Sequence, residues 1–506
     1  MPWLIKAQPW DHDAEAVTTE YFSDVGFTTE PGDTPANTHY LRRITAPMTS
    51  SRALWSGGDV GGFSETEFGR AVLAGDDGAL DHLWDHDWGG RLVQIWYTPV
   101  ERPVLADFVL MFNGTAEDFV PGVTDAVIEL RDLQVLLDVL FGRGTFAGAG
   151  GVEGTAELTG RNKPVCLGRC YRFEPVLIDS ANDVYMVDPL GFHALLAAED
   201  AGDPHTVAGS DYADYAALVA ADLSAVDYAT CEAEGLYRNS GTPAGRLLLT
   251  VEGVAPGGTW ISSFADLVAH IATTMTSFTS GDLATAAFAA VATAQPAPLQ
   301  YWWDGSGSKT VRQVIDELAD TAGAYWGIDD DRKLEIGIYT GPAGTADFAF
   351  GPREIFELDP QLVDRRMKSL RVGWGRYWST LDEGDMSPTV AAADREAFKS
   401  EYRWTATATH AGAAAAALLA RDEELRSLFV NQADAEDERD RRLDLYGPKA
   451  KGFQAEVPLT EGLRAGHTVE LTDDRYGLEA GWLGVVLEAE KDADEEVHRL
   501  TVVGPA

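Results

Sequence analysis

Residues 309–378 carry the clearest secondary-structure signal in the chain, a helix pattern followed by two strand patterns. Apolar residues recur every three or four positions from Val311 to Ala322, which places them on one side of a helix whose other side is charged or polar. Gly323 is expected to end that helix. Alternating apolar residues then predict strands over 334–338 and 370–374. The chain is therefore expected to combine helices with sheets.

The remaining patterns add short strands at both ends of the chain and several helices between them. Residues 325–328 are expected to form an aromatic turn that leads into a polar turn at 329–332, where Asp side chains can bond their own backbone. Strands are expected near 40–44, 92–97 and 104–114, and again over 466–472, 481–487 and 499–503. Further helices are expected over 264–272, 283–292, 394–402, 411–429 and 433–445.

A length of 506 residues exceeds that of one ordinary domain, and the fold class expected is α+β, β-rich and multidomain. The domain boundaries follow changes in these patterns. We expect an N-terminal β-rich domain at 1–150, a strand-helix segment at 151–235, an α/β domain at 236–365, and a C-terminal domain with long helices and a small β-barrel at 366–506.

The charge of the chain argues against nucleic-acid binding as its main activity. There are 81 acidic and 39 basic residues, giving a formal net charge of −42. Such a surface repels phosphates and cannot hold them by counterion release. An acidic wall past which DNA moves without sticking is compatible with this charge, although a general compositional bias of the source organism explains it equally well.

No cofactor or metal site is expected. The three cysteines, Cys166, Cys170 and Cys231, lie far from any histidine cluster and are expected to be buried free thiols. His82 and His86 would share one face of a helix, but no third ligand is identifiable. No apolar run is long enough to span a membrane, and the N-terminal residues do not resemble a secretion signal.

No catalytic residues are assigned either. The many carboxylates could include a glycosidase pair, and the 14 tryptophans could line a sugar cleft. With so many acids, however, chance pairs are common, and no nucleophile motif of the Gly-x-Ser-x-Gly type stands in a strand-to-helix setting. A non-enzymatic protein is therefore favoured.

Several phrases, in order along the chain, resemble one known family. They are Lys163-Pro164-Val165-Cys166-Leu167-Gly168-Arg169, Thr310-Val311-Arg312-Gln313, Gly323-Ala324-Tyr325-Trp326-Gly327, and Leu370-Arg371-Val372-Gly373-Trp374-Gly375-Arg376-Tyr377-Trp378. The family is that of the tail hub proteins of long-tailed bacteriophages and gene transfer agents. The resemblance covers most of the chain, from about residue 20 to the end, and none of its phrases is a catalytic motif.

The resemblance implies a structural virion protein with β-barrel-like hub domains and helical insertions. It implies a homotrimer at the tail tip, assembled in the host cytoplasm. The implied partners are a distal tail protein above and a tail fibre or spike protein below, with the tape measure protein as a further candidate. DNA would be met only in transit during ejection, and no stable membrane association is implied.

Three copies around an axis need self-complementary surfaces, and exposed aromatic residues often anchor such interfaces. The candidate interface residues are Tyr301, Trp302, Trp303, Trp374, Tyr377 and Trp378. Aromatic residues in such runs are also commonly part of a core. Two other functions stay open on the sequence alone: a tail-associated cell-wall or polysaccharide hydrolase, and a carbohydrate-binding receptor module.

Overall fold

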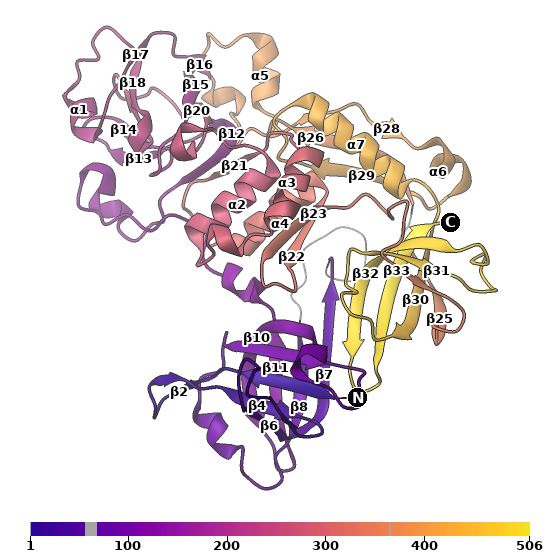
Figure 1. The fold of residues 1–506 in the computed structure, drawn as a ribbon. Helices are drawn as coiled ribbons and strands as arrows, with labels where there is room; N and C mark the ends of the chain where they lie inside the picture. The colour runs from indigo at the N-terminus through magenta and orange to yellow at the C-terminus, as the bar shows by residue number, and fades with distance from the viewer. Residues whose placement is uncertain (1, 56–67, 364–365) are drawn as a thin grey trace.

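A computed structural model describes residues 2–55, 68–363 and 366–506 of the chain. The N-terminal strands lie at the bottom of the molecule and the C-terminal strands at one side of it (Figure 1). The helices α2 to α4 lie at the centre, and residues from about 165 to 250 form a separate lobe at the top (Figure 1). This arrangement confirms the expected multidomain, β-rich α+β fold.

The largest sheet joins the two ends of the chain. Its link is the antiparallel pairing of β7 with β32, which sets Ala53 opposite Glu488 and Thr49 opposite Asp492. In sheet order, its strands are β25 (Glu357–Gln361), β30 (Ala450–Pro458), β33 (Val497–Pro505), β32 (Trp482–Asp492), β7 (Ile44–Ala53), β8 (Phe68–Ala74), β11 (Asp125–Arg131), β10 (Val109–Pro121), β9 (Leu92–Tyr97), β1 (Trp3–Ala7), β4 (Glu20–Ser23), β6 (His39–Arg42) and β5 (Phe27–Thr28), with β24 (Phe348–Phe350) and β31 (Thr468–Leu471) beside β32.

This sheet stays open. The structure therefore has open sheets where barrel-like domains and a small C-terminal barrel were expected. Within the described residues its strand order runs from β25 to β5 without closing. Both end strands are poor templates for a further neighbour. Strand β5 has only two residues, and β25 contains Pro360, which has no N–H to donate to a ladder.

The lobe at the top of Figure 1 is built from two smaller sheets. One contains β16 (Asp203–Pro204), β15 (Ala194–Asp200), β20 (Leu247–Glu252), β12 (Val165–Phe173) and β21 (Gln300–Trp303); the other contains β13 (Val176–Asp179), β14 (Val184–Met186), β19 (Leu236–Asn239), β18 (Tyr228–Cys231) and β17 (Ala208–Asp211), with helix α1 (Tyr215–Ala220) beside it. A separate two-stranded ribbon, β2 (Trp10–Asp11) with β3 (Ala16–Val17), projects from the N-terminal region.

The central core forms around α4 (Val311–Ala322), as the sequence predicted. Thr310 Oγ1 accepts a hydrogen bond from the amide of Gln313, whose side chain accepts one from the amide of Thr310. Gly323 ends the helix with a left-handed φ of 63°. Helices α2 (Phe264–Met275) and α3 (Thr285–Ala294) pack beside it, and their apolar faces share one large core.

The expected aromatic turn is instead a strand. β22 (Ala324–Ile328) pairs with β23 (Leu334–Ile338), and the polar turn joins them as predicted. Trp326 is buried and its indole N–H donates to Asp316 at 2.8 Å, which ties the hairpin to α4. The sequence suggested a turn because Gly327 interrupts the apolar run, but a strand tolerates this glycine where an arginine side chain, that of Arg52, approaches it closely.

The long Ala-rich helix expected over 411–429 is also wrong. Helix α6 covers only Ala411–Ala416, and Arg421–Arg426 form strand β29, which pairs in parallel with β26 (Met367–Trp374). The available edge of β26 supplies backbone partners that override local helix propensity. Strands β27 (Arg403–Trp404) and β28 (Ala408–Thr409) pair with β26 too. Helix α7 (Gln432–Tyr446) agrees with the prediction, whereas α5 (Ala392–Phe398) ends before residues 399–402, which were also expected to be helical.

Candidate functional site

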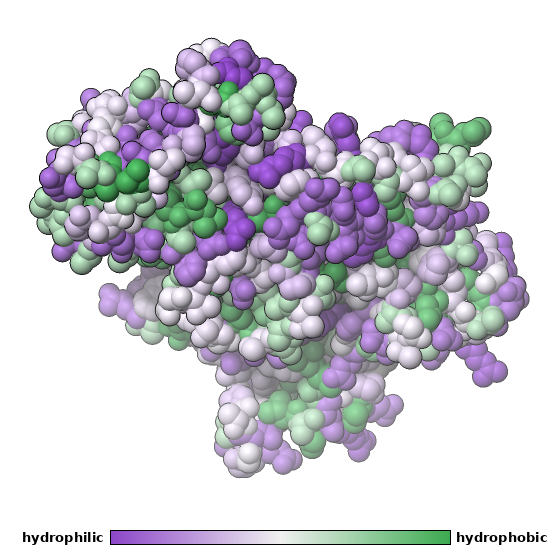
Figure 2. Space-filling model, turned by 90° about the horizontal axis from the view of Figure 1, so that it is seen from above, coloured by the Kyte–Doolittle hydropathy of each residue, from purple (hydrophilic) through white to green (hydrophobic). Residues whose placement is uncertain are grey.

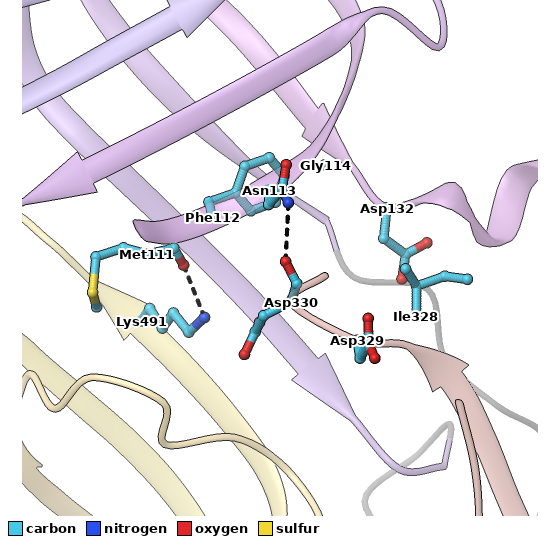
Figure 3. Close-up of a pocket in the computed structure, with 9 residues that line it drawn as sticks. All are labelled: Met111, Phe112, Asn113, Gly114, Asp132, Ile328, Asp329, Asp330 and Lys491. Atoms are coloured by element: carbon cyan, nitrogen blue, oxygen red, sulfur yellow. Dashed lines mark hydrogen bonds between the residues drawn. The ribbon is translucent and has the colours of Figure 1, made fainter. Parts of the chain in front are cut away.

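A small cavity lies where β10, the β22–β23 turn and β32 meet (Figure 3). Asn113 Nδ2 donates to the carbonyl of Asp330 at 3.0 Å, and Lys491 Nζ donates to the carbonyl of Met111 at 3.1 Å. The cavity has a volume of about 10 Å³, which suits a single water molecule rather than a substrate. It is a junction that holds the N-terminal, central and C-terminal parts together.

A larger hollow of about 180 Å³ lies over β25, β30, β33 and β32. We call it the acidic groove. Its charged lining residues are Glu357, Asp359, Glu456, Glu488, Glu490 and Arg499. Arg499 lies 2.9 Å from Glu490 and 3.4 Å from Glu456. Desolvation alone would lower the pKa of Arg499, but hydrogen bonds to Asp492 and Glu490 outweigh it and raise that pKa.

Three of the predicted interface residues are buried inside the chain. Tyr301, Trp302 and Trp303 are 1%, 7% and 7% exposed, because β21 is paired with β12 and covered by the central core. Trp302 stacks on Phe173 with ring centroids 4.0 Å apart. Burial raises the pKa of Tyr301. These side chains serve the core and leave almost no surface for a neighbouring copy.

The other three predicted interface residues, Trp374, Tyr377 and Trp378, are half-buried at a surface rich in arginine. The Cζ atom of Arg403 lies 4.8 Å from the ring centroids of both Trp374 and Tyr377. Arg376 lies over Trp378 at 4.1 Å. We call this surface the arginine–aromatic patch. Its members are Tyr171, Arg371, Trp374, Arg376, Tyr377, Trp378, Tyr402, Arg403, Trp404 and Arg426.

The arginines of this patch differ in their ionic partners. Arg376 is 2.7 Å from Glu401, and Arg371 forms a short contact with Glu424. The guanidinium of Arg403 makes no hydrogen bond or ion pair with any residue that the structure describes, and its buried Nε has no acceptor. The exposed Arg426 likewise forms no ion pair within the described ranges. Sequence reasoning found the aromatic residues but missed these arginines. The available signal was their position, since Arg376 precedes Tyr377 and Arg403 follows an aromatic residue, Tyr402.

A buried arginine supports the patch from below. Arg172 is 3% exposed, and its Cζ lies 5.3 Å from the centroid of the Tyr377 ring. The guanidinium groups of Arg172 and Arg403 therefore both lie near Tyr377. Arg172 pairs with Glu199. Desolvation lowers the pKa of Arg172, and the charge of Arg403 lowers it further. Glu199 thus pairs with Arg172 and not with Arg403.

The histidine pair considered as a metal site does not acquire a third ligand. His82 and His86 have ring centroids 5.9 Å apart, and His86 Nε2 lies 3.7 Å from Asp11. Across the described ranges no group of three or more His, Cys, Asp or Glu side chains is arranged to hold a metal ion. All three cysteines are buried free thiols, as expected. Among the helices that the structure describes, none has the length and apolarity to cross a membrane.

Comparison with known proteins gives matches in structure alone. No family model and no curated protein matches the chain. A tail protein from Neisseria meningitidis is 8% identical, with a TM-score of 0.41 over 99% of this chain and 96% of that chain. The 43 kDa tail protein of prophage MuSo2 from Shewanella oneidensis is 8% identical, with a TM-score of 0.41 over 99% of this chain and 98% of that chain. A chain of a gene transfer agent virion is 14% identical, with a TM-score of 0.43 over 73% of this chain and 89% of that chain.

Proposed function

We propose that the chain is a structural component of a phage-like tail, and specifically the hub at the tail tip. The observation that carries this proposal is where the family phrases fall in the fold. Thr310–Gln313 cap α4, and Gly323–Gly327 end α4 and begin β22. Leu370–Trp378 form the second half of β26 and part of the arginine–aromatic patch. The matching residues thus build the framework and part of one surface, and none of them lines the small cavity or the acidic groove.

The surface of the molecule mixes polar and apolar side chains. Figure 2 shows hydrophilic and hydrophobic residues mixed over the upper face. Large apolar side chains are nevertheless exposed at separate places, including Trp84, Leu362 and Leu418, which are 68%, 102% and 100% exposed. Apolar residues exposed singly in this way are common on folded proteins and favour no particular function by themselves.

In the proposed hub, three copies surround the tail axis, join a distal tail protein to a fibre or spike protein, and line the conduit for DNA. A net charge of −42 suits such a wall because carboxylates repel the phosphates that pass it. The role consists of assembly and symmetry matching, and it requires no turnover.

The test is the mass and symmetry of the purified chain, followed by its location in particles. Light scattering is expected to give three times the monomer mass of 54.6 kDa, and negative-stain averages are expected to show a threefold ring with a central opening. Mass spectrometry of particles from the source organism is expected to find the chain. A monomer that is missing from particles and clears cell-wall substrate in a zymogram would overturn the proposal in favour of a hydrolase.

A further inference from the structure

We propose that the arginine–aromatic patch of one copy docks into the acidic groove of a second copy. The inference deepens the proposed hub, since it rests on several copies standing side by side, and it identifies the contact between them. The patch lies on the sheet of β26 and β27, whereas the groove lies on the large sheet. The strand β26 lies apart from β25 and β30 in the ribbon (Figure 1).

Arg403 is an arginine of the patch that has neither a hydrogen bond nor a counter-ion among the described residues. Tyr171, Trp374 and Tyr377 surround its guanidinium with ring centroids 5.1, 4.8 and 4.8 Å from Cζ. These rings fix the plane of the guanidinium and shield it from water, which strengthens an ionic contact made there. Its two NH₂ groups stay available to donate hydrogen bonds to a planar carboxylate in a bidentate pair.

The turn after β26 passes directly beside the guanidinium of Arg403. Gly375 has a φ of 54°, and a Cβ atom at this position would come within 3.4 Å of Arg403 Cζ. That separation is an ordinary van der Waals contact, so it is the positive φ of the turn after β26 that favours glycine here. Trp374 Nε1 is also buried without an acceptor, so a second donor beside Arg403 lacks a partner within the described residues.

The acidic groove carries the opposite excess. Arg499 faces Glu456, Glu490, Asp492 and Glu495 and cannot neutralise all of them. Glu357 and Asp359, on the exposed edge strand β25, form no ion pair with any described residue. From the residues that the structure describes, Glu488 accepts neutral hydrogen bonds alone, from Ser51 and Thr501. A hollow of about 180 Å³ is large enough to receive an arginine side chain.

The net charge of the chain opposes association of two copies. Two copies that each carry a charge of −42 repel each other, so a stable contact needs a site where positive and negative groups meet directly. A contact between two different patches is heterologous, and it closes into a ring or continues as a filament. Raising the salt from low to physiological concentration should strengthen association, because screening weakens the long-range repulsion more than a partly buried pair.

The experiment is sedimentation velocity of purified full-length variants over a concentration series at physiological salt. Arg403→Glu and the double variant Glu357→Lys/Asp359→Lys are each expected to weaken self-association by at least about tenfold. Arg403→Lys keeps the charge but loses the planar fork, and an intermediate loss is expected. Two control variants make the same charge changes at exposed positions away from both surfaces: Arg102→Glu and Glu101→Lys/Glu157→Lys. Their self-association constants are expected to stay within about twofold of wild type.

The decisive step is to mix Arg403→Glu with Glu357→Lys/Asp359→Lys. The first variant retains an intact groove and the second an intact patch, so together they can form one native contact. A mixture should therefore yield dimers but no closed ring. Circular dichroism and thermal melting of each variant verify that it is folded.

Three results would overturn the contact: wild-type association by Arg403→Glu, failure of the mixture to dimerise, or a wild-type chain that stays monomeric at every concentration. The hub proposal is judged separately. If Arg403→Glu still forms a threefold ring, or if a chain that is monomeric in solution is found in tail particles, the proposed contact is wrong. The structural role in the tail would remain.

Discussion

Replacement of Glu438 should break the link between α7 and α4. Glu438 has a fully buried side chain, and its carboxylate accepts hydrogen bonds from Arg441 Nε at 2.7 Å and Arg442 Nε at 2.6 Å. Arg441 donates onward to the carbonyl of Tyr339 at 2.6 Å, and Arg442 donates to the carbonyl of Asp320 at the end of α4. One carboxylate thus holds two guanidinium groups that clamp three elements together.

Glu438→Gln keeps the shape of the side chain but removes its charge and turns an acceptor into a donor. Breaking a buried ion pair from one side costs about 3–5 kcal/mol, because the remaining charge stays desolvated. Arg441 and Arg442 are 26% and 13% exposed, so water can relieve part of this cost. We therefore expect the lower end of that range, about 3 kcal/mol.

The assay is native-state hydrogen exchange of the amides in α4 and α7, since a chain of this size need not unfold in one step. A loss of about 3 kcal/mol corresponds to exchange that is about 150-fold faster. The exposed Asp437→Asn on the same helix is the control and should change stability by less than about 0.5 kcal/mol. The triple variant Glu438→Leu/Arg441→Met/Arg442→Met should recover most of the protection, because it removes the uncompensated charges. Unchanged exchange in Glu438→Gln would refute the reasoning.

Further predictions concern pH and backbone space. Burial lowers the pKa of His498 to about 3, below the value of 6.5 for an exposed histidine, so the unfolded chain takes up the proton first and stability falls as the pH drops below about 6.5. His498→Gln should remove about 2 kcal/mol of the difference in unfolding free energy between pH 7.5 and 5, measured by urea denaturation; an unchanged difference would show that another group titrates. Gly168→Ala would place a Cβ 1.8 Å from the carbonyl of Leu299 and should prevent native pairing of β12 with β21, seen as loss of soluble protein. Gly375→Ala meets only Arg403 and should cost about 1–2 kcal/mol, so a melting temperature equal to wild type would contradict the strain argued at that turn.

Local chemistry determined the elements that the sequence predicted well. Helix α4 follows from the spacing of its apolar residues, the hydrogen bonds that Thr310 and Gln313 exchange, and the left-handed conformation of Gly323. Strands β23 and β26 follow from alternation, and α7 ends at Gly447 as expected. All of these signals act over a few residues, so they survive whatever the rest of the chain does.

Only part of the candidate surface could be found in this way. Trp374, Tyr377 and Trp378 were identified as aromatic residues that could lie at an interface, and they are half-buried at the surface. Tyr301 to Trp303 have the same composition but lie in the core, because β21 pairs with β12 beneath the central helices. The role of Arg403 depends on Tyr171, more than 200 positions away, which no local pattern indicates.

Tertiary structure alone decided how the ends of the chain are joined and which segments became strands. Residues 421–426 are charged and helix-prone, yet they form β29 because β26 offers a ladder of backbone partners. The contact between Ser51 and Glu488 crosses 437 positions and lies in one continuous sheet. Sequence periodicity indicates which face of a helix or strand is apolar. Which distant element covers that face depends on the packing of the whole molecule, where backbone pairing and burial outweigh local propensity.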